Sequence, residues 1–361
     1  MPDFKHIPFD TKNTEFVKAL RKKVNAYFKE KNISKHSNFN MVLKTIFMIS
    51  IYFVPFAFII SGAIESLWIN LLLWSVMGFG MAGIGMSVMH DANHGSYSKN
   101  KKVNLILGHI IEFVGGSALN WKLQHNVLHH TYTNISGMDE DLESDPMMRF
   151  SPDQERKRFH RFQHIYAWFL YSLMTISWSI DKDFAQLVRY KKKGLLSMQK
   201  VNFSKAMVFL ICSKVFYYGY ALVLPLIFAS TWWSALIGYV IMHLIAGFVL
   251  AIVFQCAHVV ENADYPKPLS TGNMKDNWFA HQLHTTSNFA MKSRLFSWYV
   301  GGLNFQVEHH LFPNICHVHY KKISPIVKAT AKEFGLPYNN FKTFFGALMC
   351  HTRHLKNLGT S

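Results

Sequence analysis

The sequence predicts an all-α integral membrane protein, with four transmembrane helices in two hairpins, interfacial helices and a cytosolic helical cap that carries a metal site. The first observation is apolar length: from Thr45 to Met89 the only charged residue is Glu65, and the stretch Val215–Ala257 has none. Each stretch is long enough for two spans of about 20 residues. The second is that no lysine or arginine lies between Lys44 and Lys99. The third is that histidines gather near the ends of these stretches.

The order of the elements follows from the hydropathy pattern. We expect residues 1–40 to form a cytosolic amphipathic N-terminal segment, because Phe16, Leu20, Val24 and Phe28 recur at helical spacing. Residues 41–361 then form one membrane domain, since no short repeat or low-complexity linker divides them. The predicted spans of this domain cover residues 42–63, 66–89, 206–229 and 233–256.

Two shorter apolar segments and one lysine depart from this pattern. Residues 103–119 and 164–180 are short for spanning, and Gly115 and Gly116 interrupt the first, so we expect interfacial or re-entrant helices. Lys214 falls about eight residues inside the third predicted span, which places it roughly 12 Å deep at ~1.5 Å per residue. Its ammonium group is expected at that depth unless the side chain snorkels to the surface.

The net charge of +17 comes from 38 lysine and arginine residues against 21 acidic residues. If all cationic segments lie on one side of the membrane, the positive-inside rule makes that side cytosolic and places both termini there. A basic surface beside a bilayer can bind anionic lipid head groups or attract an acidic protein, so we expect no nucleic acid partner. Four scattered cysteines without a C-x-x-C pair predict reduced thiols.

The placement of the histidines says more than their number, which is 20. On a helix, residues four apart share one face, so His90 and His94 can bind one ion, as can His125 and His129. Adjacent residues diverge by about 100°, so neighbouring histidines can serve two ions. The candidate ligands form three clusters, with one more histidine directly after the last span: His90 and His94; His125, His129 and His130; Gln306, His309 and His310; and His258.

This set is too large for one ion of four- to six-fold coordination, so we expect two ions. Counting spans from a cytosolic N-terminus, all four groups converge on the cytosolic side. Imidazole suits iron, zinc, copper and nickel, so the ligand type alone does not name the metal. The sequence has no Glu-x-x-His pair, which argues against a carboxylate-rich di-iron bundle, and no zincin H-E-x-x-H motif.

The boxes HDANH, HNVLHH and QVEHH, with LFP immediately after the last one, resemble the three histidine boxes of membrane fatty-acid desaturases. The glutamine of the third box is similar to the front-end, or linoleoyl-CoA type, subgroup, and the resemblance runs from about Met41 to Tyr320. It implies O2-dependent desaturation of a fatty acyl chain, carried on coenzyme A or on a lipid. It also implies two non-haem iron ions bound by His90, His94, His125, His129, His130, His258, His309 and His310, with Gln306 in a ligand-like position.

The chemistry agrees with this resemblance. Removing two hydrogens from an unactivated alkyl chain requires a metal centre that activates O2, while the protein orients the target carbons. Many front-end desaturases of eukaryotes carry a fused cytochrome b5 domain with an HPGG motif, which this chain lacks. We therefore expect an external electron donor, either ferredoxin or free cytochrome b5.

Polar residues near the boxes are candidates for orienting the imidazoles. We expect this role for Asp91, Asn262 and Glu308. Asn120 and Trp121, just ahead of the second box, either line the substrate entrance or pack at the membrane interface. An acidic run could also orient the imidazoles, and the alternative for it is a solvated loop. This run contains Asp139, Glu140, Asp141, Glu143 and Asp145.

Other histidines are weaker candidates. His281 and His284 have ligand-pair spacing, but the resemblance does not assign them a metal. His243 lies deep in the fourth predicted span without a box partner, so we leave it out of the site. His317 and His319 are weaker still. Surface or packing roles are expected for His109, His160 and His164.

The nearest alternative function is a related membrane di-iron hydroxylase or oxygenase of a lipid or carotenoid. A histidine-rich metal transporter is disfavoured, because its ligands would lie within the spans rather than at their ends. A membrane-anchored zinc hydrolase would need an open metal position and a general base. The sequence leaves open the double-bond position, the chain length and the choice between acyl-CoA and acyl-lipid.

Overall fold

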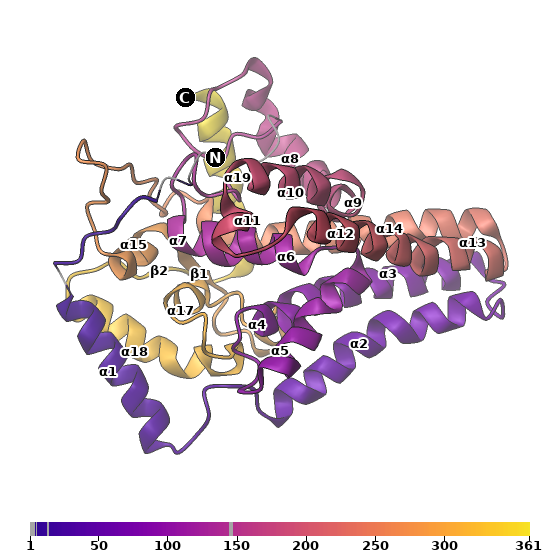
Figure 1. The fold of residues 1–361 in the computed structure, drawn as a ribbon, viewed down its shortest axis with the longest axis horizontal. Helices are drawn as coiled ribbons and strands as arrows, with labels where there is room; N and C mark the ends of the chain where they lie inside the picture. Colours follow the sequence, from indigo (N-terminus) through magenta and orange to yellow (C-terminus); the bar gives the residue numbers. More distant parts are fainter. Residues whose placement is uncertain (1–3, 5, 13, 144–146) are drawn as a thin grey trace.

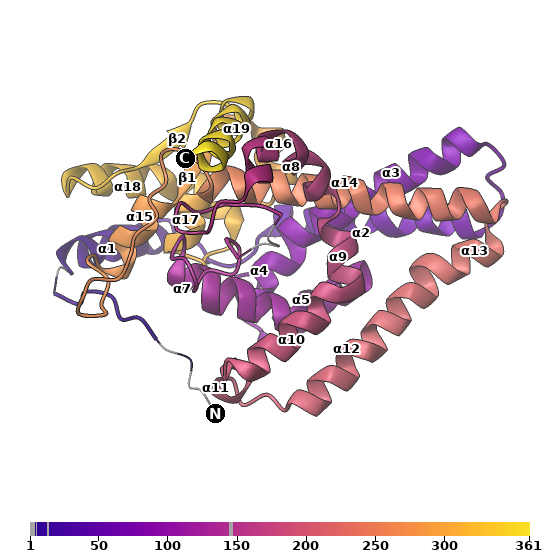
Figure 2. The same ribbon diagram turned by 90° about the horizontal axis from the view of Figure 1, so that it is seen from above.

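The computed structural model describes residues 4, 6–12, 14–143 and 147–361. Over these ranges the chain is mostly helical, and its strands are a short parallel pair, β1 (Ser287–Phe289) beside β2 (Asn339–Phe341). Figures 1 and 2 show two long helical hairpins extending from a helical cap. The predicted class, an all-α membrane protein, is confirmed.

Four helical stretches in the described residues are long and apolar enough to cross a membrane. They are Phe39–Ile60, Leu67–Asn93, Phe203–Phe228 and Trp232–His258, each within a few residues of its predicted span. The first is α2 (Phe39–Ile60), and the second joins α3 (Leu67–Gly83), a π-helical segment (Ile84–Met89) and α4 (His90–Asn93). The third joins α12 (Phe203–Tyr218), a π-helical segment (Gly219–Val223) and α13 (Leu224–Phe228); the fourth is α14 (Trp232–His258).

The two hairpins pack together along α3, which contacts both α2 and α14. Trp74 of α3 is fully buried, and its ring lies over Gly238 of α14. A β-carbon built at Gly238 would lie 2.0 Å from Trp74 Cδ1, so a glycine is required for this close approach. Away from this interface, large apolar side chains such as Phe39 and Trp68 are exposed, as expected of surfaces that face lipid.

The segment between the hairpins begins with a helix pair that bends by 111°, Lys101–Val114 followed by Ala118–Tyr132. The bend falls at Gly115, whose φ of +83° favours glycine. The pair contains α5 (Lys101–Gly108), a 3-10 turn (His109–Val114), α6 (Ala118–Trp121), a π-helical segment (Lys122–His129) and α7 (His130–Tyr132). It is followed by α8 (Gln163–Ser172), α9 (Met174–Ser177), a π-helical segment (Trp178–Lys182), α10 (Asp183–Lys192) and α11 (Leu195–Met198).

Lys214 is buried in α12 and does not snorkel to the surface. Its ammonium group donates to the Gly115 carbonyl at 2.6 Å and to the Trp178 carbonyl at 2.8 Å, and it pairs with Asp183 Oδ2 at 2.5 Å. A buried charge is tolerated when it is paired and hydrogen-bonded. The lysine therefore fastens the bent helix pair and α10 to the third span.

The remaining helices form the cap together with the segment between the hairpins. The apolar face of the N-terminal helix is buried against α18, with Phe16, Leu20 and Val24 in one cluster with Ile323 and Val327. The predicted amphipathic helix is therefore present and packs on the cap. These helices are α1 (Glu15–Glu30), α15 (Trp278–Thr285), α16 (Arg294–Tyr299), α17 (Gln306–Leu311), α18 (Tyr320–Glu333) and α19 (Phe344–Thr360).

The close approach at Gly238 leads to a test of the hairpin packing. Gly238→Ala should lower the free energy of unfolding in detergent by about 1–3 kcal/mol, because the new methyl group overlaps a ring that has no room to move. Gly219→Ala is the matched control, since a β-carbon there meets nothing within 4 Å. Equal stability of the two variants in chemical unfolding would contradict this packing.

Candidate metal centre

Four chain segments bring the predicted histidines to one place at the cap end of the spans. His90 opens α4 at the end of the second span, and His94 follows that helix directly. His258 is the last residue of α14. The second box lies on the segment Lys122–His129 and α7, and the third box lies on α17. Residues more than 200 positions apart therefore share one site, as the topology argument predicts.

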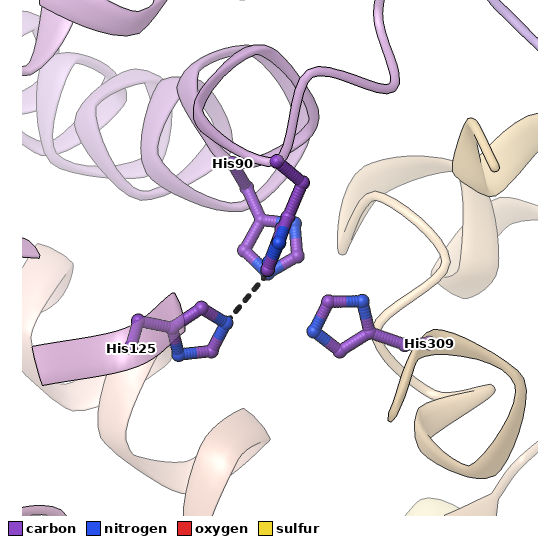
Figure 3. Close-up of side chains that lie close together, drawn as sticks. His90, His125 and His309 are labelled. Atoms are coloured by element: carbon purple, nitrogen blue, oxygen red, sulfur yellow. Dashed lines mark hydrogen bonds between the residues drawn. The ribbon is translucent and has the colours of Figure 1, made fainter. Parts of the chain in front are cut away.

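The first group contains one histidine pair and two single histidines. Ring nitrogens of His90, His94, His125 and His309 all lie within 4.8 Å of one another. His90 Nε2 is 3.2 Å from His125 Nε2, and Figure 3 shows these two rings and that of His309 pointing toward a common centre. Four imidazoles at this spacing can hold one metal ion.

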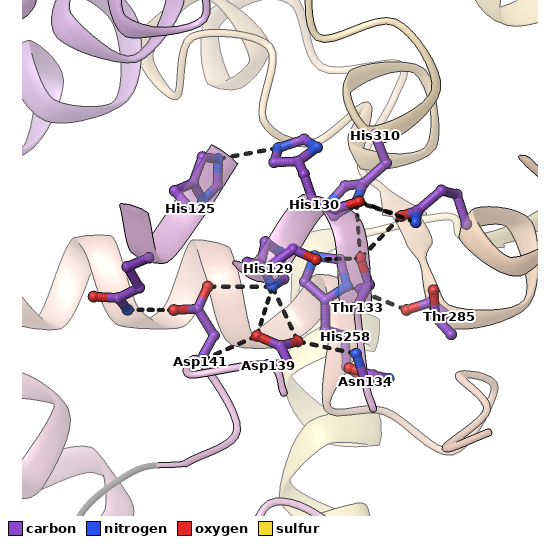
Figure 4. A network of polar contacts seen from close by, with 12 residues as sticks. His125, His129, His130, Thr133, Asn134, Asp139, Asp141, His258, Thr285 and His310 are labelled. Carbon is purple, nitrogen blue, oxygen red and sulfur yellow. Dashed lines mark hydrogen bonds and ion pairs between the residues drawn. The ribbon is translucent and has the colours of Figure 1, made fainter. Parts of the chain in front are cut away.

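The second group lies beside the first. Ring nitrogens of His129, His258 and His310 lie within 4.8 Å of one another, and Figure 4 shows these rings on neighbouring segments. His130 contacts both groups: its Nε2 is 2.9 Å from His309 Nε2 of the first group, and its ring stacks on that of His310 of the second group, with ring centroids 4.4 Å apart. The adjacent pairs of the second and third boxes thus reach two sites, as expected for two ions.

The second box supplies a histidine to each group. His125 lies with the first group and His129 with the second, yet the ring nitrogens of these two residues also lie within 4.8 Å of one another and of an Asp141 oxygen. The pair predicted from helical spacing is therefore close in space. The segment Lys122–His129 is π-helical, and His125 Nε2 also lies 3.2 Å from His130 Nε2.

In the second group, His129 and His258 each have a ring nitrogen that points away from the common centre and has a polar partner. His129 Nδ1 lies 3.1 Å from both carboxylate oxygens of Asp139 and 3.3 Å from Asp141 Oδ2. His258 Nδ1 lies 3.1 Å from the Thr285 carbonyl. Carboxylates and carbonyls in these positions fix the tautomer and leave the other ring nitrogen free for a metal.

The third box is held in the same way. His309 Nδ1 is 3.2 Å from the Tyr320 hydroxyl, and His310 Nδ1 is 2.8 Å from Gln282 Oε1. The sequence interpretation missed Gln282, Thr285 and Tyr320 as partners. No local pattern marks them, although Gln282 lies between His281 and His284, which were considered as ligands.

The electrostatics of the cluster fit a metal better than a set of charged imidazoles. Burial and the neighbouring rings lower the pKa of His94, His309 and His310 well below the usual value, so these rings are neutral. Among the described residues, His94 Nε2 and His310 Nε2 are buried without a hydrogen-bond partner. Such atoms are costly unless they bind something, and neutral imidazole nitrogens are good ligands for iron.

Asp139 supplies the negative charge next to the second group. Burial disfavours the ionised form of Asp139. His129 and two backbone N–H donors outweigh this effect, and they lower the pKa of Asp139 below its usual value. Asn134 N and Asp141 N donate to it at 2.9 and 3.0 Å. An ionised Asp139 is thus available to accept from His129 Nδ1.

Asp91 lies next to the first group, and His317 holds its carboxylate on the side away from that group. Its Oδ2 accepts from His317 N at 3.1 Å and lies 2.9 Å from His317 Nδ1, whose Nε2 lies 2.7 Å from Lys44 Nζ. Its Oδ1 is 3.7 Å from His90 Nδ1. Asp91, for which the sequence predicts an orienting role, therefore joins the first box, α2 and the segment after the third box.

The other expected orienting residues have different surroundings. Glu308 is fully buried, but it accepts from Tyr338 OH at 2.7 Å and from Asn288 Nδ2 at 2.9 Å, so it holds α17 in place; burial raises its pKa to about 7. Asn262 is exposed, and its backbone carbonyl accepts from Asn339 Nδ2. Gln306 is buried on α17, and its Nε2 has no hydrogen-bond partner in the part of the chain described.

The residues of the acidic run have different hydrogen-bond partners. Glu140 binds Arg189 and Tyr190, away from the histidines, and Glu143 accepts from Gly137 N in the loop. Asp139 and Asp141 face His129, as described above. Asp145 lies outside the described residues.

The weaker histidine candidates lie apart from the two groups. His281 Nε2 lies 2.9 Å from the Thr133 carbonyl, and His284 Nδ1 pairs with Asp264 at 3.0 Å. His243 lies 2.7 Å from Tyr217 OH and 3.1 Å from Thr175 Oγ1, within the membrane-spanning part. The others also have partners or positions elsewhere: His109 lies beside Glu112, His160 accepts from Lys157 N, His164 is partly exposed on α8, and His319 lies beside the His36 carbonyl.

An apolar cavity opens next to the first group, on the side of the spans. Trp121 lines it, and the Trp121 ring packs against His125, with ring centroids 4.4 Å apart. The cavity is small, with a volume of about 20 Å³, and its walls come from α3, the π-helical segment Ile84–Met89, α6, α9, α14 and the turns between them. Asn120 instead donates to the Asp183 carbonyl and supports the bent helix pair.

Comparisons with known proteins agree with this geometry. The family model described as "Fatty acid desaturase" matches residues 66–342. The chain is 38% identical to the sn-1 linoleoyl-lipid 6-desaturase of Arthrospira platensis, over 96% of this chain and 93% of that protein. It is 35% identical to the enzyme of the same name from Synechocystis, over 97% of each, and 37% identical to the acyl-lipid (8-3)-desaturase of Physcomitrium patens, over 97% of this chain and 73% of that protein. The chain belongs to the fatty acid desaturase family and is an oxidoreductase.

Proposed function

We propose that this enzyme carries out O2-dependent desaturation of a lipid-linked fatty acyl chain at two non-haem iron ions. The observation that carries the proposal is the position of the two histidine groups at an apolar cavity whose lining residues come largely from the spans and the bent helix pair. Bound iron would supply the activation of O2 that an unactivated C–H bond requires.

The proposed iron ligands are the eight clustered histidines. One ion belongs to the first group, the other to the second, and His130 contacts both groups. Gln306 is a further candidate, because its buried amide lies on the same short helix as His309 and His310. The full set is His90, His94, His125, His129, His130, His258, His309 and His310, with Gln306 in a ligand-like position.

The chain's own residues contribute orientation and exclusion of water. Asp139, Gln282 and Tyr320 fix the rings, so the ligand nitrogens are aimed before the metal arrives. Trp121 and Leu250 line the small apolar cavity beside the first group, and an alkyl chain that widens it on entry would pass the first group along one path. A fixed path is what selects two carbons of a chain that has no chemical marker of its own.

A lipid-linked substrate is supported by the curated relatives, whose names describe linoleoyl-lipid and acyl-lipid desaturases. Such a substrate can leave its polar head at the membrane surface while its tail enters the cavity. A coenzyme A thioester is the alternative outcome of the experiment below.

We further propose that both termini and the histidines are cytosolic. The basic residues that border the spans on the cap side support this orientation through the positive-inside rule. Residues 1–40 are then a cytosolic segment of the membrane domain 41–361. Electrons come from a separate carrier, ferredoxin or cytochrome b5, for which the excess of basic residues is a suitable surface.

Product analysis tests the reaction. Expression in a host without polyunsaturated lipids should give acyl chains that have lost two hydrogens, and His309→Ala should abolish this product while the protein still inserts in the membrane. His284→Ala is the matched control, because His284 pairs with Asp264 outside the cluster, and it should remain active. A product that has gained oxygen would instead identify a hydroxylase, and full activity of His309→Ala would remove the metal assignment.

The role of Asp139 can be measured by metal affinity. Asp139→Asn removes the anionic acceptor of His129 Nδ1, so we expect roughly 10- to 100-fold weaker metal binding in a cobalt titration of the metal-free protein. Glu143→Gln in the same loop should bind cobalt as the natural chain does, because the Glu143 carboxylate accepts from Gly137 N of that loop. Unchanged affinity of Asp139→Asn would contradict this orienting role.

The cavity can be narrowed without touching the histidines. A β-carbon at Gly85 would lie 3.3 Å from Leu250 Cδ2, so Gly85→Val is expected to fill part of the cavity and to fit with small shifts. Turnover of long acyl chains should fall on the order of 10- to 100-fold, since the target carbons are displaced. Iron content should stay unchanged; Gly219→Val, which faces open space, is the control. Normal turnover of all chain lengths would place the substrate elsewhere.

A further inference from the structure

One short helix of the cap lies unusually close to the membrane spans. In α16 the Trp298 ring packs against Phe47 of α2, with ring centroids 5.4 Å apart. The Tyr299 hydroxyl donates to the Phe79 carbonyl of α3 at 2.9 Å, and Ser87 Oγ donates to the Tyr299 carbonyl at 3.1 Å. The helix therefore touches both members of the first hairpin.

The level of these contacts places α16 below the membrane surface. Phe79 lies 12 residues after the start of α3, and Phe47 lies 13 residues before the end of α2. At ~1.5 Å per residue, both contacts are roughly 18–20 Å from the far end of the hairpin. The hydrocarbon core is ~30 Å thick, so the contacts lie roughly 10 Å inside its boundary on the histidine side.

The side chains that α16 and α19 leave uncovered agree with this depth. Leu295 is 78% exposed and Phe345 is 71% exposed, and Met349, one helical turn after Phe345, is 41% exposed. The two helices are joined through Phe296 and Phe344, whose ring centroids lie 4.8 Å apart, and they are neighbours where the cap meets the hairpins in Figure 2. We name Leu295, Phe345 and Met349 the apolar shelf.

Charged residues border the apolar shelf. Lys292, Arg294 and Lys342 are exposed at the beginning of α16 and just before α19. Long basic side chains next to an inserted apolar surface can reach back to lipid phosphates. The shelf is also continuous with lipid-facing residues of α2, where Ile46 is 57% exposed. Both features identify the occupant of the shelf as lipid rather than another protein.

We infer that α16 and the first turns of α19 insert into the membrane leaflet on the histidine side, with the apolar shelf among the acyl chains. The inference rests on the membrane placement of the first hairpin and goes beyond the proposed reaction. Its consequence is structural: the chain turns at Gly301 and Gly302 directly after α16 and enters α17, so the shelf sets the height of the third histidine box over the bilayer.

Spin labels in the full chain, reconstituted in nanodiscs, test this inference. Cys212 is exposed and is first replaced by serine, whereas the other three cysteines are buried. Single cysteines at Leu295 and at Phe345 then carry the label. A spin label that lies among the acyl chains of the bilayer is relaxed by dissolved O2 and is shielded from a water-soluble nickel chelate. Labels at positions 295 and 345 should therefore show a several-fold higher ratio of O2 to nickel accessibility than a label at position 332.

Two controls make the outcomes distinct. Ile46→Cys on α2 reports lipid exposure of the span, and Lys332→Cys on α18 reports water exposure of the cap. Labels at Leu295 and Phe345 that match Ile46 support insertion. Labels that match Lys332, while Ile46 is shielded from nickel, overturn it. If Ile46 is itself open to nickel, the first hairpin does not lie in the bilayer, and the inference fails with it. The proposed reaction is tested separately, by the activity of the enzyme. Because both shelf positions are exposed, labelling leaves the fold intact, and each position serves as a check on the other.

Discussion

The architecture depends on one requirement, that eight imidazoles from four distant segments remain aimed at a common volume. Imidazole nitrogens without partners are expensive to bury, and polar groups hold several of these rings by the ring nitrogen that points away from the common volume. Asp139 and the Thr285 carbonyl do this for the second group, and Tyr320 and Gln282 do it for the third box. The spans supply the scaffold, because α3 and α14 pack tightly, the second span continues from α3 to His90 in α4, and α14 ends at His258.

Much of this was predictable, because the relevant signals are local. Absence of charge over some 20 residues is sufficient to predict a span, and box spacing is sufficient to predict that side chains share a face. The one lysine within a span has an equally physical explanation. Lys214 finds Asp183 and two carbonyls inside the protein, contacts that no pattern in its own segment could have indicated.

The details that could not be predicted depend on tertiary contacts. Asp139 was one of five candidates in an acidic run, and only the fold shows that it faces His129 while Glu140 faces Arg189. The same holds for α1, whose apolar face could suit a membrane surface but is covered by α18. For the second box, helical spacing predicted that His125 and His129 lie close together, which they do, but it did not predict that the segment Lys122–His129 is wound more widely, as a π-helix.

That wider winding has a consequence for how the chain can change over time. A π-helical segment amounts to one additional residue accommodated within a regular helix, and such segments precede His90 and contain His125. Because the additional residue is accommodated, deleting one residue from either segment would restore ordinary winding with little rotation of the following histidines. One more inserted residue that is not accommodated in this way would rotate them by about 100°. Point substitutions leave this register intact. Lineages of this protein should therefore accept new side chains in these two stretches far more readily than further insertions.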